Sequence, residues 1–110
     1  MKPTTEQKKN RAVALNALTS GKYKQTTCGA MKFEDRYCAR AAMSDAVYGI
    51  HFSSSNLIID GWGLTLYQAF HARSRIDHYN DKKKEAFPEI AKRLAKYFRD
   101  CDRYNAERAS

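Results

Sequence analysis

Cysteine and histidine side chains can bind metal ions or act as nucleophiles, and the sequence contains three of each. Cys28, Cys38, His51 and Cys101 could in principle surround a zinc ion. Structural zinc sites usually contain a CxxC pair or a His-x-x-x-His pair, and this sequence has neither. We therefore predict that the protein folds without a metal or any other cofactor, with Cys38 and Cys101 as small buried hydrophobic residues.

The same residue types could form a Cys–His nucleophilic pair, but nothing in the sequence places a base beside a thiol. The sequence contains no phosphate-cradling glycine loop, no nucleophile elbow and no paired-carboxylate signature. The three cysteines are odd in number and lack tight spacing, which indicates reduced thiols in a cytosolic protein rather than a disulfide framework. We expect a protein without enzymatic activity.

A line of basic residues follows the last part of the chain, and we call it the basic ridge. Its members, at steps of four, three and four, are Lys92, Lys96, Arg99 and Arg103. At about 100° per residue they share one helix face, opposite an apolar stripe. The stripe comprises Phe87, Ile90, Leu94, Tyr97, Phe98, Cys101 and Tyr104. Such a ridge can follow a phosphate backbone or an acidic protein groove. The alternative is an ordinary solvated face, diluted here by Glu89 and Glu107.

Two smaller groups are also candidates for binding. Lys22 and Lys24 lie in a basic loop and form a second cationic region. Trp62, Tyr67 and His71 lie in a weakly charged part of the chain and could contact a small ligand or nucleotide. The sequence does not show whether Trp62 is buried.

The charge distribution favours an acidic partner. The formal net charge is +8, with nine Lys/Arg against four Asp/Glu in residues 1–50 and eleven against seven in residues 71–110. In residues 51–70, which lie between these two basic parts, Asp60 is the one residue with a formal charge. This balance suits nucleic acid or an acidic protein face, although a surplus of surface lysine would explain it too. No apolar run is long enough to span a membrane and the N-terminus is polar, so we expect a cytoplasmic protein that contacts no membrane.

The helix and strand signals along the chain predict a helix-dominated α+β domain. The 110 residues suit a single domain, with frayed ends at residues 1–4 and 106–110. Helix signals predict four helices, at residues 4–19, 36–48, 64–78 and from 87 onward, with stops at Gly21 and Gly49. A strand near residues 30–33 and two extended pieces in residues 50–60 predict a small two- or three-stranded antiparallel sheet. Residues 79–85 form a charged connector.

Several short blocks resemble a family of small phage and prophage proteins. "SGKYKQ" (20–25), "DRYC" (35–38) and "MSDAVYG" (43–49) match that family's "SGKY-Q" and "YCCLGV-CD--G" blocks. "HYNDKKKEAFPEIAKRL" (78–94) resembles its "LND---SF--IA" ending. Of the family's three cysteine positions only Cys38 is retained. The resemblance implies a phage source and no assigned enzymatic activity.

Three functional hypotheses follow. The first is a phage-encoded, non-enzymatic protein that binds and inhibits a host machine, such as a nucleic-acid-handling complex or a CRISPR-type anti-phage defence complex. The second is direct nucleic-acid binding through the basic ridge. The third is small-ligand or nucleotide binding around Trp62, Tyr67 and His71. The sequence leaves the partner's identity and the oligomeric state open.

Overall fold

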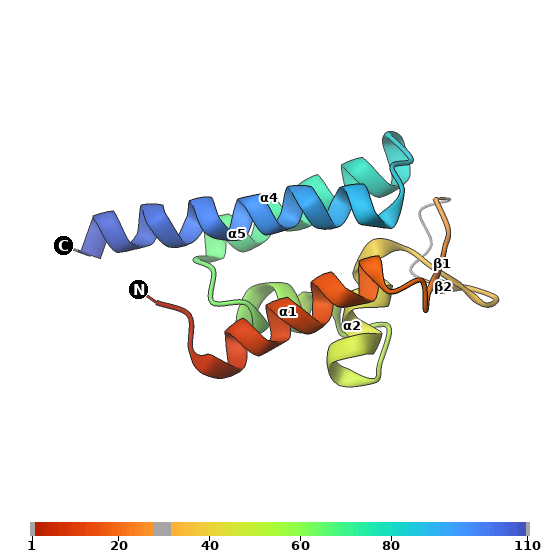
Figure 1. Cartoon of the computed structure of the whole chain (residues 1–110), viewed down its shortest axis with the longest axis horizontal. Helices are drawn as coiled ribbons and strands as arrows, with labels where there is room; N and C mark the ends of the chain where they lie inside the picture. Colours follow the sequence, from red (N-terminus) through yellow and green to blue (C-terminus); the bar gives the residue numbers. More distant parts are fainter. Residues whose placement is uncertain (1, 28–31, 110) are drawn as a thin grey trace.

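The computed structural model describes residues 2–27 and 32–109. Its helices are α1 (Thr5–Thr19), α2 (Ala39–Tyr48), α3 (Ser54–Asn56), α4 (Leu66–Asp77) and α5 (Phe87–Ala109). Two π-helical turns, η1 (Leu57–Gly61) and η2 (His78–Lys82), continue α3 and α4. The strands are β1 (Lys24–Gln25), β2 (Lys32–Phe33) and β3 (Arg36–Tyr37). The helices α1, α4 and α5 run along the long axis, α2 runs across it, and the strands lie at one end (Figure 1).

Local signals explain where the main helices begin and end. Thr4 and Thr65 each form a capping box with a glutamine three residues later, which satisfies backbone groups at the first turns of α1 and α4. After α1 and α2, Gly21 and Gly49 adopt left-handed backbone angles, with φ of 79° and 75°. Pro88 sits in the first turn of α5, where its missing N–H leaves no bond unmade. The four predicted long helices are confirmed in outline.

The small sheet differs from the prediction. Its strand order is β1-β3-β2, with β3 antiparallel to β2 but parallel to β1, so the sheet is mixed rather than antiparallel. Because Arg36–Tyr37 forms the central strand, α2 begins at Ala39 rather than at residue 36. The predicted strand near residues 30–33 appears as Lys32–Phe33, and its first part lies outside the described residues.

Residues 50–60 were predicted as extended pieces, and this was wrong. The segment turns and then forms α3 and η1, with Leu57 and Ile58 at 0% and 2% exposure in the core. A short apolar run fits a buried helix as well as a strand, and here packing against α1, α2 and α4 decides for the helix. The charged connector after α4 is likewise the π-helical turn η2 for most of its length.

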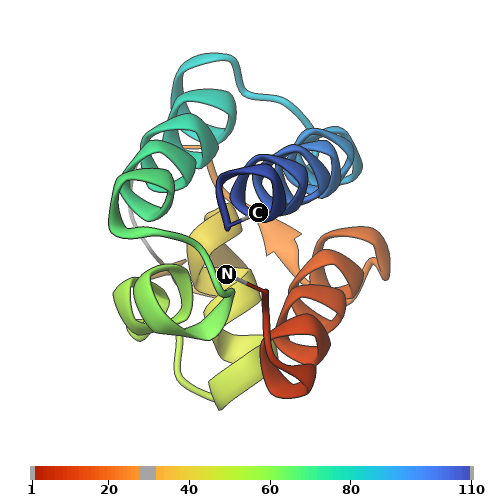
Figure 2. The same cartoon turned by 90° about the vertical axis from the view of Figure 1, so that its left-hand side faces the viewer.

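The core lies where α1, α2, α4, η1 and α5 meet. Ala39 and Ala42 of α2 are fully buried, and α2 packs most extensively against α1. Figure 2 looks along the bundle and shows α5 flanked by α4 on one side and α1 on the other. This arrangement leaves the outer faces of α4 and α5 next to each other on the surface.

Asn80 is a buried hydrogen-bonding hub. The sequence placed Asn80 in the charged connector of residues 79–85, but in the structure Asn80 is only 1% exposed. Its Oδ1 accepts from the Gln25 side chain (3.0 Å) and the Ala39 backbone (3.2 Å), and its Nδ2 donates to the Thr26 carbonyl (3.0 Å) and to Asp81. Asn80 thus joins η2 to β1 and to the start of α2.

A second set of polar contacts ties α1 to η1 and α5. The side chains of Gln7, Asn10 and Arg11 donate to successive backbone carbonyls of residues 60, 61 and 62. Arg11 also forms a bidentate pair with Asp102, at 2.8 and 3.0 Å. These bonds explain how an arginine can be buried in this small domain, because charge-assisted hydrogen bonds satisfy its donors.

Candidate functional site

The inner face of α5 confirms the predicted stripe except at its end. Phe87, Ile90, Leu94, Phe98 and Cys101 are all at most 5% exposed. Tyr104, however, is 54% exposed, and Asn105 is buried in its place.

The physical reason for this difference is a buried amide pair. The side chains of Asn105 and Gln68 exchange two hydrogen bonds, at 3.0 and 3.1 Å. The four-residue step from Cys101 to Asn105 continues the buried face, so Tyr104 turns outward next to α4. Tyr104 is thereby available for contact with a partner.

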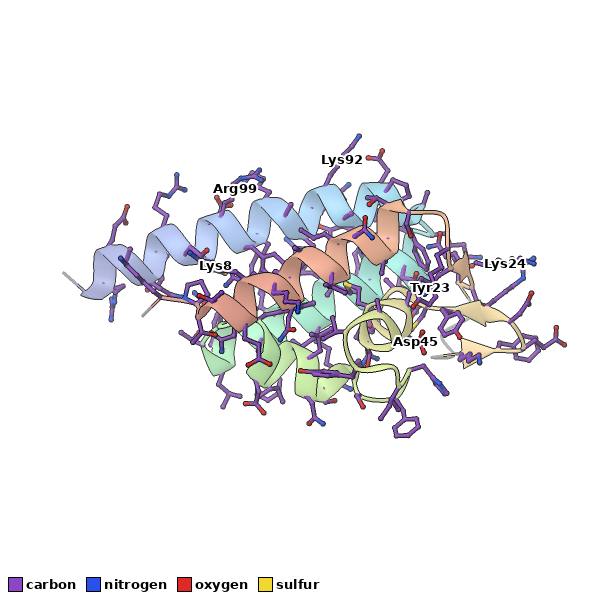
Figure 3. All side chains as sticks on the ribbon, turned by 60° about the horizontal axis from the view of Figure 1, so that its bottom comes forward. Lys8, Tyr23, Lys24, Asp45, Lys92 and Arg99 are labelled. Atoms are coloured by element: carbon purple, nitrogen blue, oxygen red, sulfur yellow. The ribbon has the colours of Figure 1, made fainter. Side chains whose placement is uncertain are left out.

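The basic ridge is exposed, as predicted from the helical spacing. The side chains of Lys92, Lys96 and Arg103 are 75%, 71% and 73% exposed. Lys92 and Arg99 project outward from α5 in Figure 3.

Carboxylates on the same helix partly neutralise this ridge. Asp100 lies 2.7 Å from Lys96 and 3.5 Å from Arg103, and Glu89 lies 3.3 Å from Lys92. The hydrogen bond from Lys96 holds the pKa of Asp100 below its usual range. Sequence reasoning counted Glu89 but missed Asp100, although its spacing of four from Lys96 and three from Arg103 is the signal for such pairs.

A surface groove runs between α4 and α5. One part has a volume of about 280 Å³, and a larger, more open part of about 450 Å³ continues toward the end of α5. Tyr67, His71 and Arg75 line it from α4, one residue per helical turn. From α5 the groove is lined by Arg93, Lys96, Tyr97, Asp100, Arg103, Tyr104 and Glu107, among others. We call this the α4–α5 groove.

Aromatic rings form a stack along the groove. His71 lies between two tyrosine rings, with centroids 5.6 Å from Tyr97 and 6.5 Å from Tyr67 and interplanar angles of 14° and 27°. The Tyr97 hydroxyl donates to the Gln68 carbonyl at 3.1 Å, and burial raises the pKa of Tyr97 well above its usual value. Tyr67 is 80% exposed, so the outer end of the stack faces solvent.

The groove joins two candidate sites that the sequence treated separately. Lys96 and Arg103 of the basic ridge line it together with Tyr67 and His71 of the proposed ligand site. Lys92 and Arg99 are exposed but do not line it.

Trp62 does not belong to this surface. It is 0% exposed and its ring packs edge-on against Phe98, with centroids 4.9 Å apart. The sequence left the burial of Trp62 open when it made Trp62 a candidate for ligand contact, and the structure places its indole in the core, away from the groove that Tyr67 and His71 line. Gly63, with φ of 73°, adopts a left-handed conformation there.

Lys22 and Lys24 lie at the strand end of the molecule. Lys24 is 3.1 Å from Asp35, and the Lys22 ammonium lies 5.4 Å from the centre of the Tyr23 ring. Figure 3 shows Lys24 far from Arg99, at the other end of the view. The structure therefore does not join this basic region to the ridge. Nearby, the Tyr23 hydroxyl donates to Asp45 at 2.7 Å.

The two cysteines among the described residues are buried and free. Cys38 and Cys101 are 6% and 5% exposed, and burial raises the pKa of both thiols. Within residues 2–27 and 32–109, no three His, Cys, Asp or Glu side chains come together as a metal site would require. Cys28 lies outside the described residues, so folding without metal stays a prediction.

Searches with this chain against protein-family models, curated proteins and solved structures find no match. The resemblance to small phage proteins therefore stays a hypothesis. Among the described residues, no helix is both long enough and apolar enough to cross a membrane.

Proposed function

We propose that this chain is a non-enzymatic, phage-encoded binding protein whose α4–α5 surface engages an acidic protein surface of a host complex. The observation that carries the proposal is the exposure of large apolar and aromatic side chains beside cations. Leu66, Tyr67 and Phe70 on α4 are 59%, 80% and 52% exposed, and Tyr104 on α5 is 54% exposed.

Exposed aromatic residues together with arginine are typical of protein–protein contacts. Tyrosine and arginine are enriched among the residues that dominate binding energy. Here Tyr67 and Tyr104 lie along the same groove as Arg75, Arg93 and Arg103. The net charge of +8 supports an acidic partner, because complementary charge accelerates association.

The host complex is proposed to handle nucleic acid or to act in anti-phage defence, as in a CRISPR-type system. Support for this step comes from the sequence blocks that resemble small phage proteins and from the basic surface. Occupying an acidic protein surface needs no catalytic group, which agrees with the absence of catalytic motifs from the sequence.

Direct nucleic-acid binding is the second candidate, and the ring stack favours it. The exposed ring of Tyr67, backed by His71, could stack on an unpaired base, and the neighbouring cations could contact phosphates. Against it, Asp100 lies between Lys96 and Arg103 and would face the same phosphates.

Tagged protein captured from a bacterial lysate, with and without nuclease, tests the proposed function. A protein partner should remain bound after nuclease treatment. Binding that nuclease abolishes, and that weakens steeply with salt as phosphate contacts release counterions, would contradict the proposal in favour of nucleic acid.

A further inference from the structure

The floor of the α4–α5 groove is apolar. Ala72 and Ile76 of α4 and Ile90 and Leu94 of α5 line its smaller part, and all four are nearly buried. This part, at about 280 Å³, is slightly smaller than the sites that usually enclose small molecules, about 300–1,000 Å³, and the adjoining part of about 450 Å³ is wide open to solvent. Side chains from a peptide suit such a shallow, apolar depression better than an enclosed ligand does.

Four cations, Arg75, Arg93, Lys96 and Arg103, line the rim of the groove together with the carboxylates Asp100 and Glu107. Asp100 pairs with Lys96 and Arg103, and Glu85 pairs with Arg93. Among the described residues, the ion pairs include none to Arg75, so Arg75 is the rim cation most open to a partner's carboxylate.

Arg93 is held in place. Its guanidinium donates twice to Glu85, at 2.7 and 3.0 Å, and lies 4.3 Å from the centre of the Tyr79 ring. The position of one rim cation is therefore set before any partner arrives, which lowers the cost of ordering it on binding.

From this groove we infer that the protein binds an acidic amphipathic helix of its partner, with the helix's apolar stripe over Ile76 and Leu94 and its Asp and Glu side chains at Arg75 and Arg93. The inference rests on the proposed function and names the segment that the α4–α5 surface recognises. Two packed helices leave a straight channel between them, and a helix laid into a groove is a common mode of peptide recognition.

The dimensions fit this occupant. The part of α5 that lines the groove extends from Ile90 to Glu107. At 1.5 Å per residue this is about 26 Å, so a partner helix of four to five turns, or about 16–18 residues, would match its length. Cations lie on both sides of the apolar floor, on α4 and on α5. A matching helix would therefore carry acidic residues on both flanks of its apolar stripe.

The test uses a fluorescent 18-residue helical peptide with leucine at three- and four-residue steps and glutamate on both flanks. Its controls are a peptide with lysine for every glutamate and a scramble of the same composition. Binding is followed by anisotropy with the parent, with R75E/R93E and with K92E/R99E. The last pair is the matched control, because it makes the same change in charge on exposed cations outside the groove.

We expect saturable binding of the acidic peptide alone, at least about tenfold weaker for R75E/R93E and less than about threefold weaker for K92E/R99E. Circular dichroism checks that both variants fold. Equal losses in the two variants, no loss in either, or equal binding of the scramble would overturn the inference. So would tighter binding of a single-stranded oligonucleotide that competes with the peptide.

The lysate experiment separates this inference from the proposed function. If the parent retains a protein after nuclease treatment and R75E/R93E retains it equally, the partner does not bind at Arg75 and Arg93 in the groove, and the proposed binding of a host protein still stands. If the parent retains none, the proposed function fails and the inference fails with it.

Discussion

Replacement of Phe98 by alanine tests the packing of α5, on which the exposed surface depends. Phe98 is 4% exposed, and the centroid of its ring lies 4.9 Å from that of Trp62. The Arg11 guanidinium lies 4.6 Å from the centroid of the Phe98 ring. Phe98→Ala removes the ring and leaves a cavity beside Trp62. Such changes cost about 3–5 kcal/mol. That is a large share of the roughly 5–15 kcal/mol that stabilises a small domain.

Thermal and urea unfolding followed by circular dichroism measure this loss. For a domain of this size, each kcal/mol lowers the melting temperature by about 4 °C, so Phe98→Ala should lower it by roughly 12–20 °C. Tyr104→Ala is the matched control, an aromatic residue on the same helix that is 54% exposed. Its loss should stay below about 1 kcal/mol. Similar losses for both variants would refute the orientation of α5.

Three further predictions concern the buried polar groups and the thiols. Asn80→Ala should lower the free energy of unfolding by about 2–4 kcal/mol in urea titrations, since buried partners lose their bonds; a loss below about 0.5 kcal/mol would argue against the hub. In a Cys28→Ser background, Cys38 and Cys101 should resist alkylation at neutral pH and react once denatured. Their raised pKa values keep the thiols protonated there, so rapid native labelling would contradict the burial. A chelator should leave the melting temperature unchanged, whereas stoichiometric zinc and loss of structure would show a metal site.

Sequence reasoning found the elements whose signals are local. The α1 boundaries follow from Thr4 and Gly21, and the start and buried face of α5 follow from its apolar period. Fraying at both ends stays a prediction, although α5 is helical as far as Ala109.

Distant contacts explain what sequence reasoning missed. Asn80 meets Gln25, Thr26 and Ala39, none of which is a sequence neighbour, so its buried position could not be read from an Asn-Asp pair. The mixed sheet has the same cause, because the parallel pairing of Lys24–Gln25 with Arg36–Tyr37 joins residues that are not neighbours in the sequence.

The candidate site was predictable in its parts but not in its assembly. The spacing of Lys96 and Arg103 placed them on the exposed face of α5. That Tyr67 and His71 lie on the same groove depends on how α4 packs against α5, and no local pattern fixes that packing.

Site-specific photo-crosslinking in a bacterial host shows which face of the protein meets a partner, with the photoreactive amino acid placed at position 67 or at position 16. Tyr67 lies on the α4–α5 surface, whereas Asn16 is exposed on α1. Binding through the α4–α5 surface predicts a discrete protein adduct from position 67 that resists nuclease, with none from position 16. An adduct from position 16 alone, or a nucleic-acid adduct from position 67, would contradict it.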